Sequence, residues 1–192
     1  VVSNWDGYSA PDIMETFKEA TGVNGEMAFH ATNEEVMGKV TASGGKGYDV
    51  LFVSSPFAEA LNKMGLLAEI DHAKIPNMKH FYKEAMNLDF DKGNQFQVPY
   101  AWGTTGLCYR SDLVSGTPSS WNDLLEPNDD IKGKITMLST DRWLLAAGLL
   151  SLGYSVNETD PAKLNEAKEK LISAKKNLLA YDDTVFYTKL VT

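Results

Sequence analysis

The sequence has little of what metal and redox chemistry requires. Its 192 residues include one cysteine, Cys108, and three histidines, His30, His72 and His80. A single cysteine excludes an intrachain disulfide and leaves the redox compartment open. The histidines are widely spaced, and no two have the spacing of paired ligands on a helix, so we expect no metal site. Because Cys108 lies in an apolar run, we interpret it as a buried structural thiol.

Positive charge and long apolar runs are also scarce. The chain has 18 Lys and Arg against 26 Asp and Glu, which gives a net charge of −8. An acidic surface repels phosphate backbones and anionic lipid, so we expect no nucleic-acid partner. No apolar run approaches the length that spans a bilayer, and we expect no direct membrane insertion. The acidity does suit a small cationic ligand.

Motifs of the common enzyme classes are missing. There is no P-loop, dinucleotide fingerprint, HExxH, GxSxG or CxxC. The glycine-rich stretch 44–47 precedes a predicted strand rather than a helix, and we interpret it as a turn. Asp89 and Asp91 resemble half of a calcium loop but lack the later acidic ligands, which favours a solvated turn. The sequence therefore predicts a protein without catalytic residues or cofactor.

Strand and helix patterns alternate, as is typical of α/β proteins. The first half predicts strands at 1–4, 26–30 and 48–53 and helices at 11–20, 33–42 and 57–64. We expect Ser9 and Asn33 to cap the first two helices, and Gly22 and Gly65 to end the first and third. The apolar run at 48–53 predicts a strand of a parallel sheet that is covered on both faces.

The pattern restarts after Val98–Gly106, an aromatic stretch that we interpret as a strand crossing between two lobes. The second half predicts helices at 119–125, 144–152, 160–174 and 187–191, strands at 133–138 and 178–181, and a loop at 139–143. We therefore expect one α/β lobe at residues 1–103 and the first, incomplete part of a second at 104–192. The chain begins like a strand already under way, so we expect that a leader was removed or left out.

Candidate ligand-binding residues follow the predicted strands, because ligands of open α/β sheets bind at the carboxyl ends of the strands. These residues are Trp5, Asp6, Tyr8, Ser54, Ser55, Trp102, Asp141, Arg142 and Trp143. Aromatic faces bind apolar stems and cations, and a carboxylate is the natural counter-ion of an ammonium group.

Each candidate has a structural alternative. Trp5 and Tyr8 could be core aromatics, and Asp141 could be only a helix cap. Ser54 could cap the next helix, donate to a ligand, or act as a nucleophile, although no histidine is placed to activate it. Arg142 is a solvated charge or, with an acidic ligand, a carboxylate clamp. Trp143 is expected to be partly buried in either case.

Several stretches resemble the spermidine/putrescine-binding family of extracytoplasmic solute-binding proteins of ABC importers. They are Asn4–Tyr8, Phe17–Gly22, Tyr48–Val50, Val53–Ser55, Val98–Gly106, Trp121–Leu124 and Leu152–Asn157. The resemblance implies a periplasmic binding protein fold of type II, with two α/β lobes joined by crossing strands. It also implies that Trp5, Tyr8, Ser54 and Asp141 line the cleft. The chain stops before the return crossing and is therefore expected to be truncated.

The sequence departs from the family at three places. Gly7 replaces an acid before the tyrosine, Trp143 stands near the place of a second acid of the family, and Pro56-Phe57 replace a tyrosine after the serine pair. Fewer carboxylates hold fewer ammonium groups, because an unpaired buried charge is costly. A ligand with one amine, such as γ-aminobutyrate, is therefore a serious alternative to putrescine or spermidine.

The resemblance implies a periplasmic or extracellular receptor that captures a small linear amine and delivers it to a membrane permease. We expect a monomer whose hinge closure signals to the transporter. Two alternatives remain open. One is the binding module of an engineered sensor, and the other is a hydrolase that uses Ser54 or Asp141.

Overall fold

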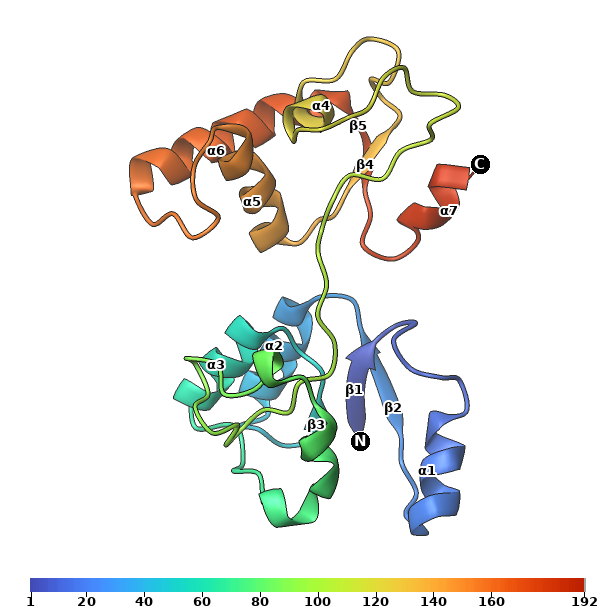
Figure 1. Ribbon diagram of the computed structural model, residues 1–192, viewed down its shortest axis with the longest axis vertical. Helices are drawn as coiled ribbons and strands as arrows, with labels where there is room; N and C mark the ends of the chain where they lie inside the picture. Colours follow the sequence, from blue (N-terminus) through green and yellow to red (C-terminus); the bar gives the residue numbers. More distant parts are fainter. Residues whose placement is uncertain (192) are drawn as a thin grey trace. The chain divides into compact units, whose positions relative to one another are not determined.

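The computed structural model describes residues 1–191, which form two compact units (Figure 1). Unit 1 is Val1–Trp102 and unit 2 begins at Gly103. The sequence placed this boundary one residue later, after Gly103. Each unit has its own parallel sheet. Among the described residues, no helix combines the length and the apolar character that a membrane span requires.

Unit 1 contains a three-stranded parallel sheet with strand order β2-β1-β3. Its strands are β1 (Val2–Trp5), β2 (Met27–His30) and β3 (Val50–Leu51). Parallel neighbours need crossover connections, and α1 (Ile13–Thr21) and α2 (Asn33–Ala42) provide them. The carboxyl ends of the three strands therefore meet at one edge of the sheet. The third strand is shorter than the predicted 48–53, and Val50 is exposed rather than covered.

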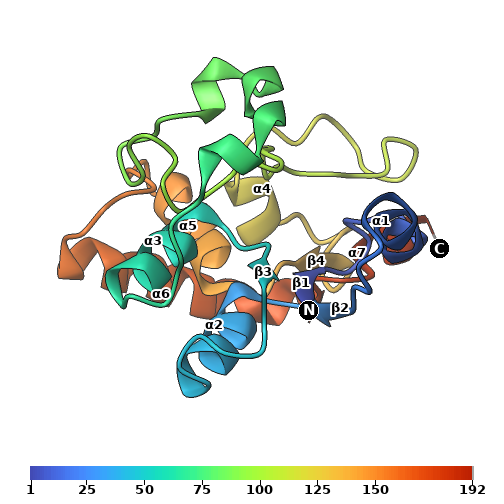
Figure 2. The ribbon, with the colours of Figure 1, turned by 90° about the horizontal axis from the view of Figure 1, so that it is seen from below.

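The core of unit 1 lies between α2 and α3 (Ser55–Lys63), where Val36, Val40 and Leu61 are buried. Helix α1 contributes no buried residue. Figure 2 shows α1 apart from α2 and α3, as Figure 1 does. Helix α1 does stop as predicted, because Gly22 adopts a left-handed φ of 74° at its carboxyl end.

Both predicted helix caps of unit 1 are wrong. Helix α1 follows Asp12, and Ser9 Oγ instead accepts a hydrogen bond from Asn4 Nδ2 at 2.7 Å. Helix α2 is capped by Thr32, whose hydroxyl accepts from the Glu35 amide at 3.2 Å. Ser9 instead bonds to Asn4, and Asn33 bonds to Ser54, so neither side chain caps a helix. The sequence pattern around a helix start does not show such contacts.

After α3 the chain forms three short 3-10 helices, His72–Lys74, Pro76–His80 and Lys83–Ala85, and then a turn held by the buried carboxylate of Asp91. Its oxygens accept from the amides of Gln95, Phe96 and Gln97 at 3.0, 3.1 and 2.9 Å. Asp89, by contrast, is 98% exposed and pairs with Lys92 at 3.1 Å. The predicted solvated turn is therefore correct for Asp89 and wrong for Asp91, which is 6% exposed.

The predicted crossing strand is not a strand. Residues 97–110 have no sheet partner in the part of the chain that the structure describes. A strand is defined by its pairing, so an extended segment with no neighbour at hydrogen-bonding distance does not qualify. Cys108 lies in this segment and is exposed, so its prediction as a buried thiol is also wrong.

Unit 2 has a two-stranded parallel sheet of β4 (Ile135–Met137) and β5 (Leu178–Tyr181). Its helices are α4 (Asn122–Leu125), α5 (Asp141–Ser151), α6 (Pro161–Ala174) and α7 (Phe186–Val191). The core joins Leu125, Met137, Ala147 and Ala174. Helices α5 and α6 pack closely at Gly148, where a Cβ would lie 3.1 Å from the Ala167 carbonyl oxygen.

The start of helix α5 differs from the prediction. Helix α5 begins at Asp141, whereas the sequence predicted a loop at 139–143 and a helix from Leu144. The apolar pattern starts only in the second turn, because the first turn is polar and exposed. Asp141, Arg142 and Trp143 are therefore helical residues with fixed backbone positions.

Candidate functional site

The edge of unit 1 at the carboxyl ends of its strands gathers several of the predicted site residues. Trp5 is the last residue of β1, and its register partner on β2 is His30. The two rings meet edge to face, with centroids 4.7 Å apart and an interplanar angle of 60°. Sequence reasoning set His30 aside when it found no metal spacing, yet this residue forms the backing of the Trp5 ring.

Ser54 follows β3 at the same edge and is held by Asn33 at the start of α2. The Ser54 amide donates to Asn33 Oδ1 at 2.9 Å, and Asn33 Nδ2 donates to Ser54 Oγ at 3.1 Å. The Ser54 hydroxyl thus accepts one bond and keeps its own proton for a further acceptor. Ser55 and Pro56 lie in the first turn of α3 rather than in the predicted loop.

The loop after β1 carries Asp6 and Tyr8, and its conformation is fixed by Gly7 and by hydrogen bonds of the Asn4 side chain. Gly7 adopts a left-handed φ of 76°, which suits glycine. Asn4 accepts from the Trp5 amide at 2.8 Å and donates to Ser9, which closes the loop over its side chain. Tyr8 is 59% exposed, and Asp6 is exposed with no ion pair among the described residues of unit 1.

Tyr100 joins this group although sequence reasoning chose Trp102 from the same aromatic stretch. The Tyr100 hydroxyl donates to the Tyr8 carbonyl. Its ring packs edge to face on Phe52, with centroids 4.6 Å apart. Trp102 is 83% exposed and makes no ring contact in the described part of unit 1. No local signal distinguishes these two aromatics, since a contact across 92 residues is a tertiary property.

Unit 2 has a comparable edge at the carboxyl ends of β4 and β5. Asp183 accepts from the Ser139 amide at 2.9 Å, from the Ser139 hydroxyl, and from Thr140 Oγ1 at 3.3 Å. Asp182 is buried and pairs with Lys189, which holds the pKa of Asp182 far below its ordinary range. The sequence analysis missed both acids. The rule that found Asp141 applies to them equally, because they follow a predicted strand.

The three predicted site residues of unit 2 stand together in the first turn of α5. Asp141, Arg142 and Trp143 are all exposed, and Trp143 is 42% exposed. Asp141 and Arg142 have no side-chain hydrogen bond or ion pair within the described part of unit 2. A carboxylate in the first helical turn is stabilised by the helix dipole. Both charges are therefore available to a ligand.

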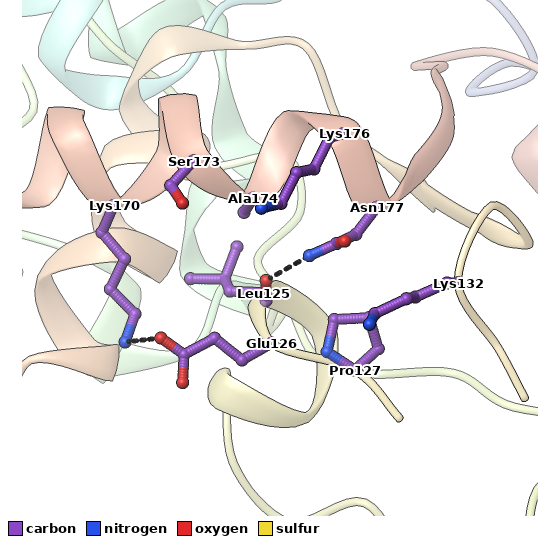
Figure 3. Close-up of a pocket in the computed structure, with 9 residues that line it drawn as sticks. All are labelled: Leu125, Glu126, Pro127, Lys132, Lys170, Ser173, Ala174, Lys176 and Asn177. Atoms are coloured by element: carbon purple, nitrogen blue, oxygen red, sulfur yellow. Dashed lines mark hydrogen bonds and ion pairs between the residues drawn. The ribbon is translucent and has the colours of Figure 1, made fainter. Parts of the chain in front are cut away.

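A pocket of about 370 Å³ in unit 2 lies elsewhere, beside α4 and the end of α6 (Figure 3). It opens near the amino ends of the strands, where Asn177 precedes β5 and donates to the Leu125 carbonyl at 3.1 Å. Three lysines and one glutamate line it, and Lys170 pairs with Glu126 at 3.0 Å. This excess of positive charge disfavours an amine ligand, and none of the predicted site residues lines the pocket.

The chain was then compared with known proteins. The family model of the bacterial extracellular solute-binding proteins matches residues 12–192. The chain belongs to this family. It is 32% identical over 192 residues to the putrescine/cadaverine-binding protein of Pseudomonas aeruginosa, covering 97% of this chain and 54% of that protein. It is 31% identical over 180 residues to the spermidine/putrescine-binding periplasmic protein of Salmonella typhimurium, covering 93% and 51%.

A solved structure described as a putative spermidine/putrescine ABC transporter from Listeria monocytogenes is also similar. It matches with a TM-score of 0.88 and 32% identity, over 94% of this chain and 55% of that one. The chain thus spans about half the length of the relatives it matches. The predicted family, its periplasmic binding protein fold and the periplasmic or extracellular location are confirmed. The matched relatives are solute-binding proteins rather than enzymes.

Proposed function

We propose that this chain forms ligand-binding lobes of a polyamine receptor that serves an ABC importer. The observation that carries the proposal is its family membership, together with relatives named for putrescine, cadaverine and spermidine. Its partners are then a small linear amine and the importer's membrane permease. Units 1 and 2 would be the two lobes, with closure on the ligand as the signal to the permease.

The exposed groups at the two strand edges suit such a ligand. A polyamine has an aliphatic stem between ammonium groups, and aromatic faces bind both parts. Trp5, Tyr8 and Tyr100 offer rings in unit 1, and Trp143 offers one in unit 2. Asp6 and Asp141 are exposed carboxylates that form no ion pair with the described residues of their own units, so each can pair with an ammonium group.

A single-amine ligand such as γ-aminobutyrate is the second candidate, and Arg142 favours it. This guanidinium is exposed next to Asp141 and has no acidic partner among the residues of unit 2 that the structure describes. Arginine binds carboxylates through two parallel hydrogen bonds. An amino acid would use Asp141 for its ammonium group and Arg142 for its carboxylate, whereas a diamine would leave Arg142 unused.

The surroundings of Ser54 argue against the hydrolase alternative. A serine nucleophile needs a neighbouring base that accepts its proton. The side chain beside Ser54 is the amide of Asn33, which is not a base at neutral pH. Ser54 is therefore better suited to donating a hydrogen bond to a ligand.

The test is calorimetric titration of the intact protein, including any segment beyond residue 192, with putrescine, spermidine and γ-aminobutyrate. Two variants, Trp5→Leu and Asp141→Asn, should each weaken binding at least about tenfold, because each removes about 1.4 kcal/mol or more of contact with the ligand. The matched controls are Tyr82→Leu and Glu169→Gln, which change an exposed ring and an exposed carboxylate away from the strand edges.

The outcomes separate the candidates. Tight binding of a diamine that is lost in Asp141→Asn supports the polyamine receptor. Binding of γ-aminobutyrate alone, lost in Arg142→Gln, supports the amino acid receptor instead. If Tyr82→Leu and Glu169→Gln weaken binding as much as Trp5→Leu and Asp141→Asn do, the assignment of Trp5 and Asp141 to the site is wrong.

A further inference from the structure

His30 is an ionisable group buried directly behind a candidate ligand-binding ring. It ends β2 beside the end of β1, and its side chain is 4% exposed. Its ring centroid lies 4.7 Å from that of Trp5. The family function does not account for an imidazole at this place, since it neither reaches solvent nor has a metal partner among the described residues.

One of the two ring nitrogens of His30 forms a hydrogen bond of normal geometry and the other does not. Nδ1 forms a hydrogen bond of 2.8 Å with the hydroxyl of Ser3, which is 1% exposed. Nε2 is buried and makes no hydrogen bond of normal geometry with the residues that the structure describes. In either neutral tautomer, Ser3 can serve Nδ1 as donor or acceptor. The imidazolium form carries two N–H donors and a full charge, which burial inside the unit disfavours.

The charged groups around His30 do not cancel this cost. Burial is the largest influence and lowers the pKa of His30; the Glu35 carboxylate and the Phe52 carbonyl oppose it, and Lys39 adds to the lowering. Glu35 and Lys39 both lie on α2 and pair with each other at 2.6 Å, and of the two the carboxylate has the larger influence on His30. The imidazole is therefore neutral at neutral pH and gains its charge only in acid.

We propose that His30 couples ligand binding at Trp5 to pH, so that charging of its imidazole weakens the binding of a cationic ligand at this edge. The inference rests on the proposed function. An ammonium group over the free face of Trp5 would lie within about 6 Å of the indole centroid. A charge on His30, whose ring centroid is 4.7 Å from that of Trp5, then repels the ammonium group.

The expected size follows from Coulomb's law. Two unit charges about 9 Å apart at an effective dielectric constant of about 20 change an equilibrium about twentyfold without screening. If salt screens the two charges as strongly as it does in bulk water, the change at physiological ionic strength is about threefold. His30 is a positioning residue in this account, because it acts on the ligand through Trp5.

The experiment measures putrescine affinity of the intact protein at about pH 7.5 and at about pH 4.5, with circular dichroism confirming the fold at both. Putrescine keeps both charges over this range, since amines of this kind titrate near pH 10. His30→Asn keeps a partner for Ser3 but cannot become charged. His30→Phe keeps a ring against Trp5 and serves if the first variant does not fold. His80→Asn, at an exposed histidine, is the control.

The natural protein and His80→Asn should bind about three- to twentyfold more weakly at the lower pH. The uncharged His30 variants should lose that part of the pH dependence and keep only what protonation of ligand-binding carboxylates contributes. Equal pH dependence in all variants would overturn the inference while leaving the proposed function intact. No putrescine binding at either pH would overturn both.

Discussion

The buried carboxylate of Asp91 gives the sharpest stability prediction. It accepts three backbone amide hydrogen bonds of 2.9–3.1 Å from Gln95, Phe96 and Gln97. Asp91→Ala removes all three bonds at once. Water that enters the vacated space restores part of the loss, so we count about 1 kcal/mol for each bond, the usual net value. The free energy of unfolding should fall by about 3 kcal/mol.

Asp89→Ala is the matched control for this change. Asp89 lies two residues away, is 98% exposed, and makes only a surface pair with Lys92. Exposed pairs of this kind contribute between about 0 and 1 kcal/mol. The control therefore removes the same side chain from the same turn without removing buried hydrogen bonds.

Two assays test the prediction. Urea denaturation gives the free energy of unfolding of each variant. Amide hydrogen exchange of Gln95, Phe96 and Gln97 reports the local effect, which should be roughly 100-fold faster exchange in Asp91→Ala. The same residues lead into Tyr100, so ligand affinity should fall as well. If the two variants unfold within about 0.5 kcal/mol of each other, the reasoning about buried carboxylates is wrong.

Three further predictions concern packing, positioning and charge. Gly148→Ala should destabilise the protein by about 0.5–2 kcal/mol, because its Cβ meets α6 at 3.1 Å, whereas Gly38→Ala, with open space around it, should stabilise by about 0.5–1 kcal/mol in urea denaturation. Asn33→Ala should cost about 1–3 kcal/mol and weaken ligand binding, since it frees the serine after β3. The hydrogen bond from Lys163, together with those from the Asp160 and Thr159 amides, lowers the pKa of the Glu158 carboxyl from 4.5 to about 2. That pairing stabilises the fold above pH 4.5 and is lost as pH falls through about 2, so Lys163→Met should raise the pKa of Glu158 in an NMR titration, and an unchanged value would refute the pairing.

The sequence predicted the ends of helices and strands correctly where residues adjacent in the sequence determine them. Helix α6 begins after Asp160, whose carboxylate accepts from the Ala162 amide at 2.9 Å, and this Asp-Pro start is readable in the sequence. Strand β5 has the predicted bounds because a short apolar run between polar residues is unambiguous. The left-handed glycine that ends α1 is another such case.

Features that depend on distant residues were beyond the sequence. Ser9 and Asn33 look like helix caps locally, but Asn4 and Ser54 engage them. The composition of Val98–Gly106 predicted a strand, although strand formation requires a partner. Tyr100 and His30 enter the site through contacts that span the unit. Asp182 and Asp183, by contrast, were within reach of the rule on strand ends.

The most direct test of the account is calorimetric titration of the intact natural protein with putrescine at neutral pH and low ionic strength. The account predicts saturable binding of one putrescine per protein that is lost in Asp141→Asn and retained in Glu169→Gln. Binding of γ-aminobutyrate without any binding of putrescine would contradict the polyamine assignment. Heat from neither ligand would contradict the linear-amine receptor itself.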